Sequence, residues 1–202
     1  MRRDAQLNRE KLIESARALF AERGLNVALE EVARRAGVSI GTLYNRFPTR
    51  TDLCAAVFAD RAQTVVLTAE HALSMPDAWA GFTHFLEQLC LLQAADRGFN
   101  ELAERGLPQP GEDQRRGYEL MCELIARARR EGVLREDFTT EDLALVVWSI
   151  TRTIEATAAV SPQLWRRHLA MICDGLRAGA AHPLPEPPLR PEQLAGIIQG
   201  GC

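Results

Sequence analysis

The sequence predicts an all-α protein: a three-helix head with a helix-turn-helix, joined by a fourth helix to a larger helical body. Apolar residues recur at spacings of three and four along most of the 202 residues, and no segment alternates as a strand would. Gly and Pro residues separate these periodic segments, where helices are expected to end. We therefore expect a head over residues 1–50, a body over residues 51–182 and a Pro-rich tail over residues 183–202.

The first helix is expected over residues 8–23, because Leu12, Ala16 and Phe20 recur on one stripe with charged residues opposite. Gly24 then provides a stop signal.

Two short helices follow, over residues 29–35 and 39–46. Gly37 allows the left-handed backbone conformation of a tight turn, and Ser39 is placed to cap the second of these helices. Pro48 ends that helix, because proline disfavours helical geometry in the residue before it.

A fourth helix, capped by Thr49 or Thr51, is expected to run through Asp52 and Phe58 to about Leu73. A helix of about 20 residues spans roughly 30 Å, which is long enough to carry the head into the body.

The sequence after the fourth helix predicts four amphipathic helices and two irregular segments. Residues 99–104 can form a short helix before a loop at 106–111, and the tail is expected to be an extended or partly disordered arm with a turn of helix at 192–198. Start signals place three of the helices from Pro76, Thr139 and Ser161, and the amphipathic pattern places the fourth over residues 114–130.

Composition disfavours several classes of protein. No run of 18 apolar residues occurs and no short apolar run follows a basic start, so we expect a cytoplasmic protein without membrane span or signal peptide. The five cysteines and four histidines are scattered, which predicts no disulfide framework, no metal site and no cofactor. No carboxylate pair or Ser/His/Asp set emerges, so no catalytic residue is expected.

Charge is unevenly distributed along the chain, whose net charge is −3. Residues 1–50 hold ten basic and six acidic residues, or +4, and the remainder holds 14 basic and 21 acidic residues, or −7. A basic head on an acidic body is the distribution expected of a DNA-binding module joined to an effector domain.

The segment from Val32 to Phe47 has the spacing of a helix-turn-helix. Ala33 is small enough for a helix contact, Gly37 suits the turn and Leu43 is an apolar anchor. This pattern also fits a plain helical corner in an all-α core, so by itself it leaves both interpretations open.

The residues from Gly37 onward, G-V-S-I-G-T-L-Y-N-R-F-P-T-R-T-D-L, resemble the recognition helix of the TetR family of transcriptional regulators. The resemblance covers about residues 8–58, whereas the body matches only in helical character and length. It implies a homodimer on palindromic double-stranded DNA, whose recognition helices enter the major groove, and a small-molecule effector bound by the body.

The resemblance places the DNA contacts around the recognition helix. Asn45 can bind adenine and Arg46 guanine or a phosphate, so these two are the expected readers of sequence. Tyr44 can offer its hydroxyl to DNA, Gly41 permits a close approach, and Arg50 matches a basic position expected to hold a phosphate. The expected contacts are Arg34, Arg35, Ser39, Ile40, Gly41, Thr42, Tyr44, Asn45, Arg46 and Arg50.

The head departs from its relatives at two positions. Family members often have Thr before the second helix, where this chain has Ala28 or Leu29, and many have a basic residue where Ile40 stands. Ile40 can instead contact a thymine methyl group. Simpler roles also stay open: Tyr44 as a core residue and Ser39 as a cap alone. The alternative for Asn45, Arg46, Arg34 and Arg35 is a solvated surface residue without DNA contact.

The resemblance places the dimer interface on the last two long helices, and a pocket is expected within the body. Packing inside one chain is the alternative for every residue named. The expected interface residues are Val147, Ile150, Ile154, Trp165, Leu169 and Ile172. The expected pocket residues are Trp79, Phe82, Phe85, Phe99, Tyr118, Met121, Cys122, Trp148 and Thr151.

We expect a repressor that a small molecule releases from its operator. An activator or a ligand-free architectural protein of the same fold is one alternative. A helical small-molecule carrier or enzyme without DNA binding is another.

Overall fold

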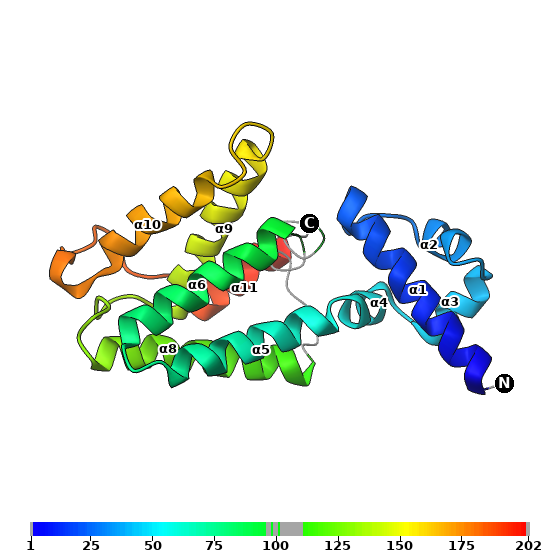
Figure 1. Ribbon diagram of the computed structural model, residues 1–202, viewed down its shortest axis with the longest axis horizontal. Helices are drawn as coiled ribbons and strands as arrows, with labels where there is room; N and C mark the ends of the chain where they lie inside the picture. Colours follow the sequence, from blue (N-terminus) through cyan, green and yellow to red (C-terminus); the bar gives the residue numbers. More distant parts are fainter. Residues whose placement is uncertain (1, 96–97, 99–100, 102–110, 201–202) are drawn as a thin grey trace.

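The computed structural model describes residues 2–95, 98, 101 and 111–200. Within these residues every regular element is helical, and extended pairing is limited to one antiparallel bridge between Leu134 and Arg177. The predicted all-α class is confirmed. The elements in Figure 1 are α1 (Arg2–Arg23), α2 (Leu29–Arg35), α3 (Ile40–Arg46), α4 (Arg50–Val57), α5 (Ala59–Ser74), α6 (Ala78–Ala95), α8 (Glu112–Arg130), α9 (Thr140–Thr157), α10 (Leu164–Leu176), η1 (Ala178–Ala180) and α11 (Pro191–Gly200).

Helices α1 to α4 form the head, the blue and cyan end of the molecule in Figure 1. Leu12, Phe20, Val32 and Leu43 are fully buried in its core, each from the apolar stripe of its helix. The core cluster extends to Phe58, the residue after α4. Helix α1 begins at Arg2, several residues before the predicted start.

Local start signals fix the beginnings of two helices as predicted. Thr49 and Asp52 exchange the two hydrogen bonds of a capping box at the start of α4. Thr139 and Asp142 do the same for α9. Helix α6, by contrast, begins two residues after Pro76.

The predicted fourth helix is interrupted at Phe58, so α4 and α5 are separate helices. Beside the break, Arg17 Nη2 donates to the Val57 carbonyl oxygen at 3.0 Å and lies 3.2 Å from an Asp60 carboxylate oxygen. The prediction of one continuous helix was wrong. Its interruption involves an arginine 40 residues earlier in the chain, which local periodicity does not reveal.

The body packs α5, α6 and α8 against one another, α9 packs against α6 and α8, and α10 packs against α9 and α6 (Figure 1). One apolar cluster holds Phe85 and Leu120, between α5, α6 and α8. The other holds Phe82, Ile150 and Trp165, between α6, α9 and α10. Among the described residues no helix is both long enough and apolar enough to cross a lipid bilayer.

The tail leaves the body through η1, runs without regular structure and ends in α11, a longer helix than the predicted turn at 192–198. Arg135 Nη2 donates to the His182 carbonyl oxygen at 2.8 Å, which holds the start of the tail. The helix predicted at 99–104 lies outside the described residues except for Glu101, as does the predicted loop except for Gly111. The division of the chain at residues 50 and 182 stays a prediction.

Candidate nucleic-acid interface and body cavity

The turn between α2 and α3 is a complete helix-terminating motif. Gly37 adopts a φ of 69°, its N–H donates to the Arg34 carbonyl oxygen at 3.2 Å, and the Val38 N–H donates to the Ala33 carbonyl oxygen at 3.0 Å. These are the two bonds of a Schellman motif, which needs the left-handed conformation that glycine adopts readily. The sequence of the turn therefore determines the direction in which the chain continues from α2 into α3.

Helix α3 is held by its cap and its core face. Ser39 Oγ accepts the Thr42 N–H at 3.2 Å and shares a second hydrogen bond with the Thr42 hydroxyl at 2.9 Å. The predicted cap is confirmed. Leu43 is fully buried beneath the helix, and Phe47 leaves helical geometry just before Pro48.

The opposite face of α3 is open to solvent. Tyr44 is 47% exposed, so the core interpretation of this residue does not hold. Asn45, Arg46 and Gly41 are exposed as well, whereas Ile40 is half-buried against the head core. Contact of these residues with DNA stays a prediction.

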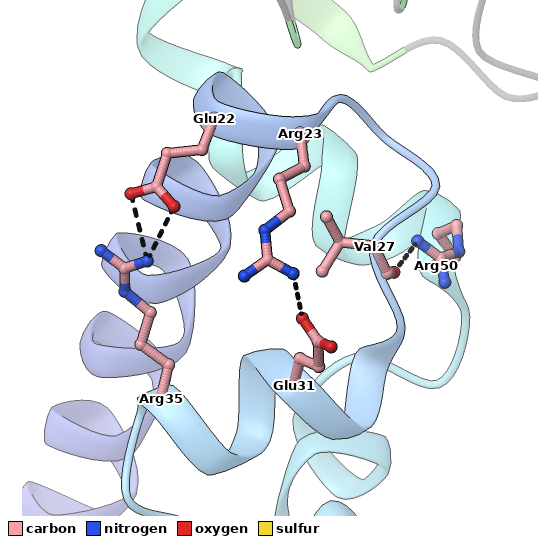
Figure 2. A network of polar contacts seen from close by, with 6 residues as sticks. All are labelled: Glu22, Arg23, Val27, Glu31, Arg35 and Arg50. Carbon is pink, nitrogen blue, oxygen red and sulfur yellow. Dashed lines mark hydrogen bonds and ion pairs between the residues drawn. The ribbon is translucent and has the colours of Figure 1, made fainter.

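The two arginines of α2 differ in their surroundings. Arg35 Nη1 lies 3.2 and 3.3 Å from the two carboxylate oxygens of Glu22 on α1, as Figure 2 shows. Arg23 pairs with Glu31 at 2.8 Å between the same two helices. Arg34 is exposed and has no ion pair among the described residues, so it is the freer of the two to contact a phosphate.

Arg50 braces the loop between α1 and α2. Its Nη1 donates to the carbonyl oxygens of Leu25 at 2.6 Å and of Val27 at 2.7 Å; Figure 2 shows the second bond. Its contact with a DNA phosphate stays a prediction. Such a contact would use the N–H groups on the other two guanidinium nitrogens.

The start of α2 lacks a side-chain cap, as the absence of Thr at Ala28 implied. We expect Ala28→Thr to raise the free energy of unfolding by about 1 kcal/mol, because its hydroxyl oxygen would accept an N–H of the first helical turn. For a chain of this size the melting temperature should rise by about 2–4 °C, as thermal unfolding measures.

Ala28→Val is the matched control, because valine has the shape of threonine without the hydroxyl. Equal melting temperatures for the two variants would contradict capping as the cause.

A cavity of about 220 Å³ lies between α6, α8, α9 and α11. It contains three predicted pocket residues. Partial burial, together with the neighbouring Cys122, raises the pKa of Tyr118, so its phenol stays protonated at neutral pH and can donate a hydrogen bond. This body cavity is lined by Leu89, Tyr118, Met121, Val147, Trp148 and Leu194, among others.

The other predicted pocket residues are dispersed. Phe82 and Phe85 are buried in two separate apolar clusters. The Trp79 ring lies under Arg177, whose guanidinium carbon is 4.4 Å from the ring centroid. Thr151 is buried between α6 and α9, and Phe99 lies outside the described residues.

The predicted dimer residues lie inside a single chain. Five are buried and Ile172 is partly buried against the same cluster, which agrees with the alternative of intrachain packing. Exposed apolar side chains on the same two helices are Leu145 (42%), Leu164 (41%) and Met171 (57%). The dimer itself stays a prediction.

The sequence did not point to the contacts between head and body. The Leu25 N–H donates to a Glu101 carboxylate oxygen at 2.8 Å. A Cβ added to Gly98 would lie 3.0 Å from Phe20 Cβ, so the backbone there approaches α1 closely. Together with Arg17 at the break after α4, these contacts attach α1 to the body. They join residues up to 78 positions apart and leave no local signal.

Comparisons with known proteins agree with this architecture. Residues 12–57 match the family described as bacterial regulatory proteins, tetR family. Residues 77–178 match the C-terminal domain of SbtR-like transcriptional regulators. An HTH-type transcriptional regulator of Staphylococcus aureus (strain USA300) is 42% identical over 55 residues, which are 27% of this chain and 30% of that protein.

Solved structures extend the similarity beyond the head. RolR in complex with its ligand resorcinol is 26% identical with a TM-score of 0.53, over 92% of this chain and 99% of RolR. FadR of Bacillus subtilis, in complex with stearoyl-CoA, has the same fold at 16% identity, with a TM-score of 0.62 over 83% of this chain and 98% of FadR. With both of its domains matched, the chain belongs to the TetR family of bacterial transcriptional regulators.

Proposed function

We propose that the protein is a homodimeric repressor that binds a palindromic operator and is released from it by a small molecule. The observation that carries this proposal is the exposed face of α3, where Tyr44, Asn45 and Arg46 project from a helix held at both ends. In a dimer, two such helices reach successive major grooves of one DNA duplex. Asn45 and Arg46 then read bases, and Tyr44 and Arg34 hold the backbone.

The proposed release couples the body to the head through the break between α4 and α5. Arg17 of α1 contacts Val57 and Asp60 on either side of this break, so a shift of α5 is transmitted to α1. The Leu25 bond to Glu101 provides a second connection. A tilt of each head changes the spacing of the two recognition helices, and binding of both half-sites then loses affinity.

The size of the body cavity favours a small effector. Its volume of about 220 Å³ is below the roughly 300 Å³ at which pockets for drug-sized ligands begin. A compound of one ring fits this volume, in agreement with the resorcinol bound by RolR, whereas an acyl-CoA such as the FadR ligand does not.

Titration of palindromic and random duplexes with the purified protein tests DNA recognition. We expect the palindrome to bind at least about 10³-fold more tightly, with an affinity that falls steeply with salt concentration. Equal affinity for both duplexes would contradict a sequence-specific regulator. Transcription in vitro from a promoter that overlaps the bound palindrome then separates repression from activation.

Tyr44→Phe should weaken binding to the palindrome about 5- to 150-fold. The variant loses only a hydroxyl, and one hydrogen bond of about 0.5–1.5 kcal/mol is lost in each half of a dimeric complex. Fluorescence anisotropy with labelled operator measures the change. Tyr118→Phe is the matched control on the body, where the same loss of a hydroxyl should leave ligand-free DNA binding unchanged.

A further inference from the structure

Gln93 and Thr151 form a buried polar pair in the apolar body. Each is 1% exposed, and they join α6 to α9 through a contact of 2.9 Å between Gln93 Oε1 and Thr151 Oγ1. The amide nitrogen of Gln93 is buried and has no hydrogen-bond partner among the described residues. Buried polar groups are nearly always paired, so an orphan in this position calls for an explanation.

The orientation of the amide decides which of its ends contacts Thr151. Thr151 Oγ1 also lies 3.0 Å from the Val147 carbonyl oxygen, and one hydroxyl proton cannot serve two acceptors. Rotation of the Gln93 amide by half a turn would let its NH₂ donate to Thr151, whose hydroxyl would then donate to Val147. In that orientation the carbonyl oxygen of Gln93 takes the position where the nitrogen has no partner.

The pair lies next to the body cavity. Leu89 and Val147 line the cavity, and Gln93 and Thr151 follow four residues later on the same two helices. Residues four apart share one helical face, so the pair lies about 6 Å along α6 and α9 from these two lining residues. Neither residue of the pair lines the cavity itself, so a ligand that contacts this amide has to extend one substituent from the cavity between α6 and α9.

A hydroxyl group satisfies the orphan in either orientation of the amide. It accepts a hydrogen bond from the NH₂ group or donates one to the carbonyl oxygen. Glu141 is the one charged residue among those that the structure describes along the cavity, and a carboxylate disfavours an anionic ligand.

We propose that Gln93, oriented by Thr151, is the polar anchor of the effector site, and that the effector is an uncharged, single-ring compound with a hydroxyl group. The ring packs in the body cavity, and its hydroxyl completes the hydrogen bonding of the Gln93 amide. This inference rests on the proposed response to a small molecule.

Binding to the 202-residue protein is measured by quenching of tryptophan fluorescence, because Trp148 lines the cavity. Phenol and cyclohexanol serve as probes, with toluene and methylcyclohexane as partners of the same shape without the hydroxyl. The wild type should bind each hydroxylated probe about tenfold more tightly than its partner, or about 1.4 kcal/mol. Gln93→Met should abolish this preference and leave the affinity for toluene unchanged or higher.

The melting temperature of Gln93→Met shows whether the variant is folded. Removal of an unpaired buried amide should raise the melting temperature by about 2–4 °C, and DNA affinity without ligand should stay that of the wild type. Thr151→Val, which keeps the shape of the side chain, should reduce the preference for a hydroxyl in part.

Two results would overturn the anchor. In one, the wild type binds hydroxylated and unsubstituted probes equally or binds neither. In the other, Gln93→Met keeps the preference, as expected if the orphan amide is paired only with a buried water. Phenol that binds through Gln93 without weakening DNA affinity would instead contradict ligand-induced release and leave the anchor in place.

Discussion

Replacement of Phe58 by alanine is expected to lower the free energy of unfolding of the head by about 3–5 kcal/mol, as large-to-small changes of buried aromatic residues do. Phe58 is 2% exposed and stacks on Phe20 of α1 with 6.3 Å between ring centroids. A side chain at Gly98 would lie 3.1 Å from its ring, so the body closes over the same residue. The substitution leaves a cavity where α4, α5 and α1 meet.

The three tryptophans allow head and body to be followed separately. Trp79, Trp148 and Trp165 all belong to the body, so tryptophan fluorescence reports its unfolding, whereas far-ultraviolet circular dichroism reports both parts. The head cluster shares no member with the two body clusters. In Phe58→Ala we therefore expect helix content to be lost at a lower temperature than the fluorescence change.

Phe85→Ala is the control, because Phe85 is equally buried but lies in a body cluster. Its loss should shift the fluorescence transition to lower temperature. Coincident transitions in Phe58→Ala would contradict separate cores and would make head and body one cooperative unit.

The sequence predicted those parts of the fold that depend on interactions between residues no more than four or five positions apart. Helix α2 has the predicted bounds, the Ser39 cap holds Thr42, and the capping box of Thr139 and Asp142 starts α9. Each depends on side chains that bond to a backbone group nearby in the chain, so local sequence contains the whole signal. The exposed face of α3 follows, because Leu43 fixes which side is buried.

The sequence did not predict features that depend on distant residues. The break at Phe58 involves Arg17, and the bonds of Arg50 to the α1–α2 loop cross 25 and 23 residues. The resemblance identified Arg50 as a basic position but could not show that two carbonyl oxygens already occupy one of its nitrogens. The orphan amide of Gln93 is likewise visible only once α6 and α9 are packed together.

The spacing of apolar residues along a helix also cannot show whether its apolar face packs within its own chain or against a second copy. Trp165 and Ile150 have the spacing of an interface and are nevertheless buried within their own chain. The side chains left exposed on α9 and α10 are the better candidates for contact with a second copy. Leu164 and Met171 lie seven residues apart on one face of α10, and Leu145 is exposed on the adjacent α9.

We expect Met171→Arg to dissociate the proposed dimer and to weaken binding to palindromic DNA by about 10²–10⁴-fold. In a twofold interface each substitution is present in both subunits, so one mutation brings two unpaired charges into an apolar contact. A separated subunit contacts one half-site and loses the gain in affinity that comes from linking two binding sites.

Sedimentation equilibrium measures the dimer, and titrations with a palindrome and with a single half-site measure the loss of linkage. The wild type should prefer the palindrome, whereas Met171→Arg should bind both duplexes with the same weak affinity.

Leu67→Arg on α5 is the matched control, because Leu67 is an apolar residue of similar exposure, 59% against 57% for Met171, on a helix outside the proposed interface. It should remain a dimer with the DNA affinity of the wild type. A Met171→Arg protein that still sediments as a dimer would place the interface elsewhere than the exposed face of α9 and α10. Dissociation of both variants would show that added charge, and not its position, separates the subunits.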